Sequence, residues 1–247
     1  MQVLDLGRLK AARNAPISPL YPRHRPVSAS EARAADLRAT REFSLPGLVL
    51  MEHAARGLAV VAAERASASS PGPIVVACGP GQNGGDGLGA ARFLRSFGFP
   101  VEVVRLYDRP YRGDAAVEFA AFAPAGAVPT LVCVADVQAY ARAHLAHASL
   151  VVDALFGVGL DRELDEPARA LIEAINACAA PVVAADLPSG LDADTGLPRP
   201  VAVEADVTAA MGFVKQGCAT ALGMRFCGRL VEVDIGLPFE VHGPYRA

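Results

Sequence analysis

The sequence lacks the features that would place it in a membrane, in the secretory pathway or on nucleic acid. No apolar stretch approaches the roughly 18–20 residues that span a bilayer, and the N-terminus shows no charged segment followed by an apolar core. No basic run stands out, and the net charge is −3, which argues against non-specific nucleic-acid binding. We therefore expect a cytoplasmic protein that acts on neither membranes nor nucleic acids.

The sequence also has few lysines and no closely spaced pair of cysteines. Lysine occurs only at Lys10 and Lys215, so arginine carries almost all of the basic charge. The cysteines form no C-x-x-C pair, the spacing typical of zinc and redox motifs, and several lie inside apolar runs. We expect reduced, buried thiols. The five cysteines are Cys78, Cys133, Cys178, Cys218 and Cys227.

What is abundant is apolar sequence, in a pattern that predicts an α/β fold. The chain has 247 residues, 52% of them hydrophobic and 20% charged, which suffices for one substantial core. From Pro73 onward, short apolar runs alternate with helical spacing, so we predict a three-layer αβα Rossmann-like domain with a mostly parallel central sheet. Strands are expected at 74–78, 101–107, 129–134, 150–153, 181–186, 201–208 and 229–234, and helices at 88–97, 114–122, 136–146 and 166–178.

Two further helices precede the first strand and form an N-terminal extension. Ser28 and Glu31 make a capping-box pattern that starts a helix running to about Arg41. A second helix begins at Leu48 and continues to the Ser/Gly/Pro-rich segment 67–73. Residues 1–26 are proline-rich and predict an extended arm, with disorder as the alternative. The expected division is an arm, 1–26, and one domain, 27–247.

The stretch 73–98 combines a strand, a glycine-rich segment and a helix. The segment GPGQNGGDG follows Cys78, and helical spacing resumes at Leu88. This order brings backbone N–H groups and a helix N-terminus to a phosphate. Gly79, Gly81 and Gly84 also satisfy G-x-G-x-x-G, which alone is a weak signal. A phosphate cradle needs no amide or carboxylate between its glycines, so Asn83 and Asp86 indicate more specific chemistry.

Polar residues follow three of the predicted strands. In an open parallel sheet, ligands bind at the carboxyl ends of the strands, so these residues are candidates for one crevice. Each also has an ordinary structural explanation as a helix cap or turn residue. The candidates are Asn83, Asp86, Asp153, Asp186 and Ser189.

The chemistry of these groups suggests a cation and a proton-transfer residue. The amide of Asn83, the carboxylate of Asp153 and the hydroxyl of Ser189 are hard oxygen ligands suited to a group 1 or 2 cation and unsuited to zinc. Asp186, beside such a cation or partly desolvated, could act as a general acid or base. Lys215 follows an expected strand end, and either a pairing with these carboxylates or a surface position would fit.

The ordered blocks of the chain resemble the YjeF N-terminal domain family, whose enzymes are NAD(P)H-hydrate epimerases. The resemblance runs from about Val27 to Pro238. Its blocks are LMEHAA (50–55), CGPGQNGGDG (78–87), DALFGVGLDRE (153–163), DLPSGLDADTG (186–196), ADVT (205–208) leading to KQG (215–217), and VDIGLP (233–238). Several ordered blocks at matching spacing are a stronger signal than one glycine motif.

The resemblance implies an enzyme that interconverts the R and S epimers of hydrated NADH and NADPH, termed NADHX and NADPHX. A separate dehydratase that accepts only the S epimer would then restore the cofactor. It also implies a homodimer and a bound potassium ion (K+) on Asn83, Asp153 and Ser189. Asp186 would be the proton-transfer residue, with Lys215 as a second. The implied substrate-binding positions are Gln82, Asn83, Gly84, Gly85, Asp86, Gly157, Val158, Gly159, Leu160, Asp161, Arg162, Glu163 and Asp186.

The sequence departs from the family in three places. Gln82 stands where the family has asparagine, which puts its ligand contact in doubt. The arm 1–26 lies outside the resemblance, and no dehydratase domain is expected after Pro238.

Two rival functions remain. One is a nicotinamide dehydrogenase using the G-x-G-x-x-G match, with Asp108 as its ribose-binding acid; it leaves Asp153 and Asp186 unexplained. The other is a non-catalytic dimeric ligand-binding or scaffold module, because a shared fold does not guarantee turnover.

Overall fold

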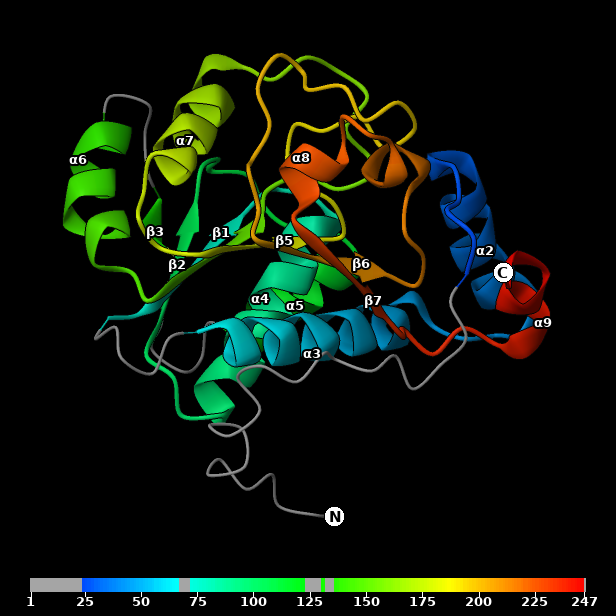
Figure 1. Cartoon of the computed structure of the whole chain (residues 1–247). Coiled ribbons are helices and arrows are strands. Elements are labelled where there is room, and N and C mark those ends of the chain that lie inside the picture. Colours follow the sequence, from blue (N-terminus) through cyan, green and yellow to red (C-terminus); the bar gives the residue numbers. More distant parts are fainter. Residues whose placement is uncertain (1–23, 67–71, 123–129, 132–135, 247) are drawn as a thin grey trace.

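The computed structural model describes residues 24–66, 72–122, 130–131 and 136–246. These residues form a seven-stranded sheet of order β3-β2-β1-β4-β5-β6-β7, in which every neighbouring pair is parallel. The order runs outward from β1 in both directions, so the chain changes direction across the sheet between β1 and β4 (Figure 1). The strands are β1 (Ile74–Cys78), β2 (Val101–Arg105), β3 (Thr130–Leu131), β4 (Leu150–Ala154), β5 (Val182–Ala185), β6 (Val207–Met211) and β7 (Arg229–Val233).

Helices cover both faces of the sheet, because its central strands are apolar on both faces. In β1, for example, Val76 packs into the core under α3 (Gly47–Arg65), α4 (Gln82–Ser96) and α5 (Asp114–Phe122). Its neighbour Val75 packs into the core under α6 (Val137–Ala143) and α7 (Glu166–Asn176). The predicted three-layer αβα architecture with a parallel sheet is confirmed (Figure 1). The remaining helices are α2 (Ala29–Glu42), α8 (Met224–Cys227), α9 (Phe239–His242) and the 3-10 turns η3 (Leu145–His147), η4 (Gln216–Ala219) and η5 (Gly243–Tyr245).

The N-terminal extension is fixed to the end of the sheet. Helix α2 begins with the predicted capping box, in which Ser28 and Glu31 exchange hydrogen bonds. Just before it, Val27 pairs in parallel with Lys215, through Val27 N–H to the Val214 carbonyl (2.9 Å) and Gln216 N–H to the Val27 carbonyl (2.8 Å). The two predicted N-terminal helices are therefore present. Residues 1–23 of the predicted arm lie outside the described residues.

The glycine-rich segment differs from its prediction. Helix α4 begins at Gln82, with Gly81 as its N-cap, and not at Leu88, so the NGGDG residues form its first turns. The glycines allow close packing: a Cβ at Gly84 would overlap the Gly79 carbonyl, and one at Gly87 would lie 2.6 Å from the Cβ of Ala154. The absence of side chains lets α4 lie directly on the ends of β1 and β4.

The late strand predicted at 201–208 is wrong in its bounds. Residues 201–206 are a connection, and β6 begins only at Val207. The Asp206 side chain accepts a hydrogen bond from the Val182 N–H at 2.7 Å. This segment therefore contacts the first residue of β5 and does not extend β6. The strand predicted at 129–134 comprises only Thr130–Leu131 among the described residues; Pro129 and 132–134, with Cys133, lie outside them.

Two properties of the described residues bear on the sequence predictions. None of the helices they form is long and apolar enough to cross a membrane. Cys78, Cys178, Cys218 and Cys227 are free thiols, and all except Cys178 are buried.

Candidate active site

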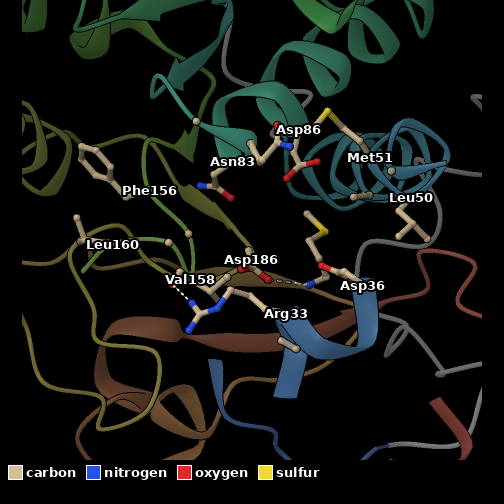
Figure 2. Close-up of a pocket in the computed structure, with 18 of the residues that line it drawn as sticks. Arg33, Asp36, Leu50, Met51, Asn83, Asp86, Phe156, Val158, Leu160 and Asp186 are labelled. Carbon is tan, nitrogen blue, oxygen red and sulfur yellow. Dashed lines mark hydrogen bonds between the residues drawn. The ribbon is translucent and has the colours of Figure 1, made fainter. Parts of the chain in front are cut away.

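A pocket of about 690 Å³ opens at the carboxyl ends of the central strands. The loops after β1, β4, β5 and β6 all contribute to its lining, and helices α2, α3 and α4 form walls. Figure 2 shows Asn83 and Asp86 on one side of this pocket and Asp186, Asp36 and Arg33 on the other. This is the position where open parallel sheets bind their ligands.

Asp186 occupies an unusual backbone position at the end of β5. Its φ is +69°, a left-handed value that non-glycine residues rarely adopt. The Leu187 N–H donates to the Ala185 carbonyl at 2.8 Å, which closes a three-residue turn centred on Asp186. Such conformations cost of order 1–3 kcal/mol and concentrate at functional sites. The turn directs the buried carboxylate into the pocket.

Lys215 fixes that carboxylate. Its side chain is 2% exposed, and its Nζ donates to Asp186 Oδ1 and to the carbonyls of Met211 and Phe213, both at 2.9 Å. These three bonds use all three ammonium protons. Oδ1 of Asp186 also accepts the Met211 N–H at 3.3 Å. The paired charges are therefore held rigidly at the pocket floor.

Asp153 and Ser189 form a second buried cluster. Ser189 donates to Asp153 through its hydroxyl (2.6 Å) and its N–H (2.8 Å), and the Leu155 N–H adds a longer bond of 3.2 Å. Burial raises the pKa of the fully buried Asp153 to about 6, against the opposing effect of these hydrogen bonds. No cationic side chain of the described residues pairs with it.

The oxygen donors near this cluster could hold a hard cation. A buried carboxylate without a positive partner favours a cation. The side-chain nitrogen of Asn83 is buried without a hydrogen-bond partner in the described structure, so it can donate to a ligand, whereas only the amide oxygen could hold a cation. The described residues contain no group of three or more His, Cys, Asp or Glu side chains placed to hold a metal ion. An amide, a hydroxyl and a carboxylate are hard oxygen donors, which suit a group 1 or 2 cation and not zinc.

Two further carboxyl groups face the pocket, Asp86 on α4 and Asp36 on α2. Burial raises the pKa of Asp86 well above its usual 3.8, and the nearby carboxyls of Asp186, Asp36 and Glu118 raise it further. Asp36 is exposed toward the pocket, yet desolvation raises its pKa to about 6, with Lys215 opposing the shift. Three carboxyl groups thus share one lysine, and that lysine is already bonded to Asp186.

The structure brings most of the predicted site residues together. The predicted residues that line the pocket are Gln82, Asn83, Asp86, Gly157, Val158, Gly159, Leu160, Asp161, Arg162, Asp186 and Lys215. Gly84 and Gly85 lie buried in α4, Glu163 is exposed outside the lining, and Asp153 and Ser189 lie behind it. Asp108, the ribose acid of the dehydrogenase alternative, is 76% exposed and pairs with Arg105, outside the lining.

Helix α2 contributes a wall that the sequence prediction missed. Ala32, Arg33, Asp36, Leu37 and Thr40 line the pocket. Their spacing of one, three and four residues marks a single helix face. The spacing predicts that these residues share one helix face, but it does not predict which part of the protein that face contacts. Arg33 also donates to the Val158 carbonyl at 3.0 Å, which joins α2 to the loop after β4.

The fold and pocket define a doubly wound α/β protein with a polar ligand site at the sheet's switch point. Residues 47–217 match the family described as YjeF-related protein N-terminus. The chain belongs to this family.

Curated relatives support the assignment. The chain is 35% identical over 208 residues to an NAD(P)H-hydrate epimerase of Limosilactobacillus fermentum, covering 84% of this chain and 95% of that protein. It is 42% identical to an NAD(P)H-hydrate epimerase of Microbacterium testaceum, covering 77% and 72%. A bifunctional NAD(P)H-hydrate repair enzyme of Salinibacter ruber is 38% identical, but the chain spans only 41% of its length.

A solved structure supports the fold. The crystal structure of yeast ynu0 matches with a TM-score of 0.70 at 24% identity, covering 85% of this chain and 91% of that chain. At this identity the likeness concerns the fold alone.

Proposed function

We propose that this protein is an NAD(P)H-hydrate epimerase, which interconverts the R and S epimers of NADHX and NADPHX. The observation that carries the proposal is Asp186: a strained, buried carboxylate, paired with Lys215, at the floor of a nucleotide-sized pocket. The names of relatives matched over most of their length point the same way.

The pocket offers a place for each part of such a substrate. The N-terminus of α4, from Gly81 to Gln82, presents backbone N–H groups and the positive end of a helix dipole toward the lining, which suits a pyrophosphate. Arg162 adds positive charge on the loop after β4. The hydrated nicotinamide ring would then lie between Asp86 and Asp186.

Asp186 would transfer the proton at the C6 centre. Its Oδ1 is engaged by Lys215 and Met211, whereas its Oδ2 lies toward Gly157, where a glycine leaves room between Asp186 and Asn83. Lys215 would hold the carboxylate in position and balance its charge. Gly84, Gly85 and Glu163, which were also expected to bind the substrate, lie outside the pocket lining.

Potassium belongs to the proposal as the resident ion. Asn83, Asp153 and Ser189 would hold it, and its charge would balance the buried Asp153 and help fix the loop after β4. We further propose a homodimer in the cytoplasm whose product passes to an S-specific dehydratase.

The test uses a mixture of R and S hydrated NADH with an S-specific dehydratase. Without this protein, recovery of NADH absorbance should be biphasic, because the R epimer converts only slowly by itself. Adding the protein with potassium should merge the slow phase into the fast one. The Asp186→Asn variant should restore the slow phase, and the Asp108→Asn variant should behave as the wild type.

A slow phase that persists with folded, potassium-supplied protein would rule out the epimerase. The pocket would then belong to a non-catalytic ligand-binding or scaffold module. Oxidoreductase turnover lost in Asp108→Asn would instead support the dehydrogenase.

A further inference from the structure

We propose that Asp86 is a second catalytic residue, which acts as a general acid on the side of the ring opposite Asp186. The inference rests on the epimerase function proposed above and assigns the route by which C6 changes configuration. An epimerisation moves the C6 hydroxyl from one face of the ring to the other.

A single rigid carboxylate serves only one face. Asp186 is held by Lys215, by the Met211 N–H and by its own turn, so it cannot follow the hydroxyl across the ring. As the anion of an ion pair with Lys215, it carries no proton to donate. A donor on the opposite wall is therefore required.

Asp86 is placed on that wall. It lies in the first turns of α4, and Figure 2 shows it facing the pocket across from Asp186. Its carboxyl makes no hydrogen bond within the described structure, although it is half-buried. A carboxyl group without a protein partner adds no stabilising bond to the fold and is free to bind a substrate.

The surroundings of Asp86 favour the protonated acid. The titratable groups that face it are Asp186 on the β5 turn, Asp36 on α2, Glu118 on α5 and Lys215 after β6. Burial and the three carboxyls raise its pKa well above the usual 3.8, and only Lys215 lowers it. A carboxylic acid on one wall, facing a lysine-paired carboxylate on the other, is a recognised acid–base arrangement.

The resulting step balances without an oxidant or reductant. Asp86 gives its proton to the C6 hydroxyl, the C6–O bond breaks with its electron pair on oxygen, and water leaves. The N1 lone pair forms an N1=C6 double bond. A water molecule then attacks C6 from the opposite face, the double-bond pair returns to N1, and Asp186 takes the proton of that water. A proton returning from Asp186 to Asp86 through pocket water restores the starting state.

The experiment compares wild type, Asp86→Asn and Asp86→Glu, with R and S epimers followed directly by chromatography. Ser96→Ala, an exposed change at the far end of α4, is the matched control. We expect Asp86→Asn to lower kcat by about 10²–10⁴-fold with little change in KM, Asp86→Glu to recover part of the loss, and Ser96→Ala to match wild type. Asp86→Asn should unfold at the same or a higher denaturant concentration, because it removes a desolvated carboxyl.

The pH dependence of the rate distinguishes an acid from a residue that only supports the structure, because only an acid must hold a proton to act. The wild-type rate should fall at high pH as Asp86 loses its proton, and this limb should be absent from the residual rate of Asp86→Asn. In ¹⁸O-labelled water, each epimerised product should carry one solvent oxygen at C6.

The outcomes separate the two proposals. If the wild type does not epimerise, the proposed function fails. If the wild type epimerises without taking up solvent oxygen, or if Asp86→Asn keeps its kcat or its alkaline limb, the role of Asp86 is wrong.

Discussion

The ammonium of Lys215 bonds directly to the carboxylate of Asp186, and both side chains are buried at the pocket floor. The two residues come from neighbouring strand ends that reverse in the same way. A three-residue turn centres on Asp186 after β5, and another centres on Gly212 after β6, where the Phe213 N–H donates to the Met211 carbonyl at 2.7 Å. The second turn delivers the carbonyls that hold Lys215.

Replacing Lys215 with methionine should destabilise the fold strongly. The change leaves the Asp186 carboxylate and two carbonyls without their donor in a buried place, and breaking one partner of a buried pair costs about 3–5 kcal/mol. Urea unfolding should show this loss as a lower midpoint with an unchanged slope.

The double variant Lys215→Met/Asp186→Leu distinguishes the ion pair from simple packing. It should recover part of the stability, because no uncompensated charge remains. A Lys215→Met variant within about 1 kcal/mol of wild type would contradict the pairing as a structural element.

Potassium should stabilise the protein in a pH-dependent way through Asp153. The pKa of about 6 in the folded state exceeds the usual 3.8, so the folded state binds a proton more readily than the unfolded state. The resulting stability is present at low pH and is lost as pH rises through about 6. A cation that binds the carboxylate restores stability above that pH.

Thermal unfolding in potassium chloride and in the chloride of a bulky organic cation measures this effect. At about ten times its Kd, potassium should add roughly 1.4 kcal/mol, or a few degrees in Tm, well above pH 6 and almost nothing below pH 4. Asp153→Asn should abolish the difference. An equal potassium effect in that variant would place the ion elsewhere.

The sequence predicted the gathering of the site because alternation and strand-end chemistry are local signals. Asp153 and Asp186 end apolar runs, and β1, β4 and β5 are adjacent in the sheet, so their loops meet. The start of α4 was misplaced because glycine is read as a loop residue, whereas here it permits contact between a helix and strand ends. Nothing local distinguishes these two uses.

The role of α2 depends on a contact distant in sequence. Asp36 reaches the pocket because Val27 pairs with Lys215, 188 positions away along the chain. Capping and periodicity give the helix its start and its apolar face, as found. They cannot say which strand end the helix will lie beside.

Adding a methyl group at Gly84 or Gly87 should show whether glycine is needed there for close packing of α4 or only for a flexible loop. In Gly87→Ala the new Cβ would lie 2.6 Å from the Cβ of Ala154 and 2.9 Å from the Sγ of Cys78, which forces α4 away from the sheet. We expect a loss of roughly 1–3 kcal/mol from overpacking, and a larger loss for Gly84→Ala, whose Cβ meets backbone.

Gly81→Ala is the matched control for stability, since no atom lies within 4 Å of its Cβ position. Chemical denaturation of the three variants gives the comparison. If Gly81→Ala and Gly87→Ala unfold at the same midpoint, close packing is not the reason for glycine at position 87.

Gln82→Asn tests whether the residue that departs from the family pattern affects binding or chemistry. Gln82 is exposed at the first position of α4 and lines the pocket, whereas its neighbour Asn83 is buried. Shortening an exposed side chain should leave the free energy of unfolding within about 0.5 kcal/mol. It should change KM for hydrated NADH by a few-fold and leave kcat unaltered, because a contact made equally in the ground and transition states alters only binding.

Asn83→Ala is the contrasting variant, since it removes the unpartnered amide and should lower kcat and the potassium effect together. A drop in kcat for Gln82→Asn would show that Gln82 takes part in the chemical step and not only in substrate binding.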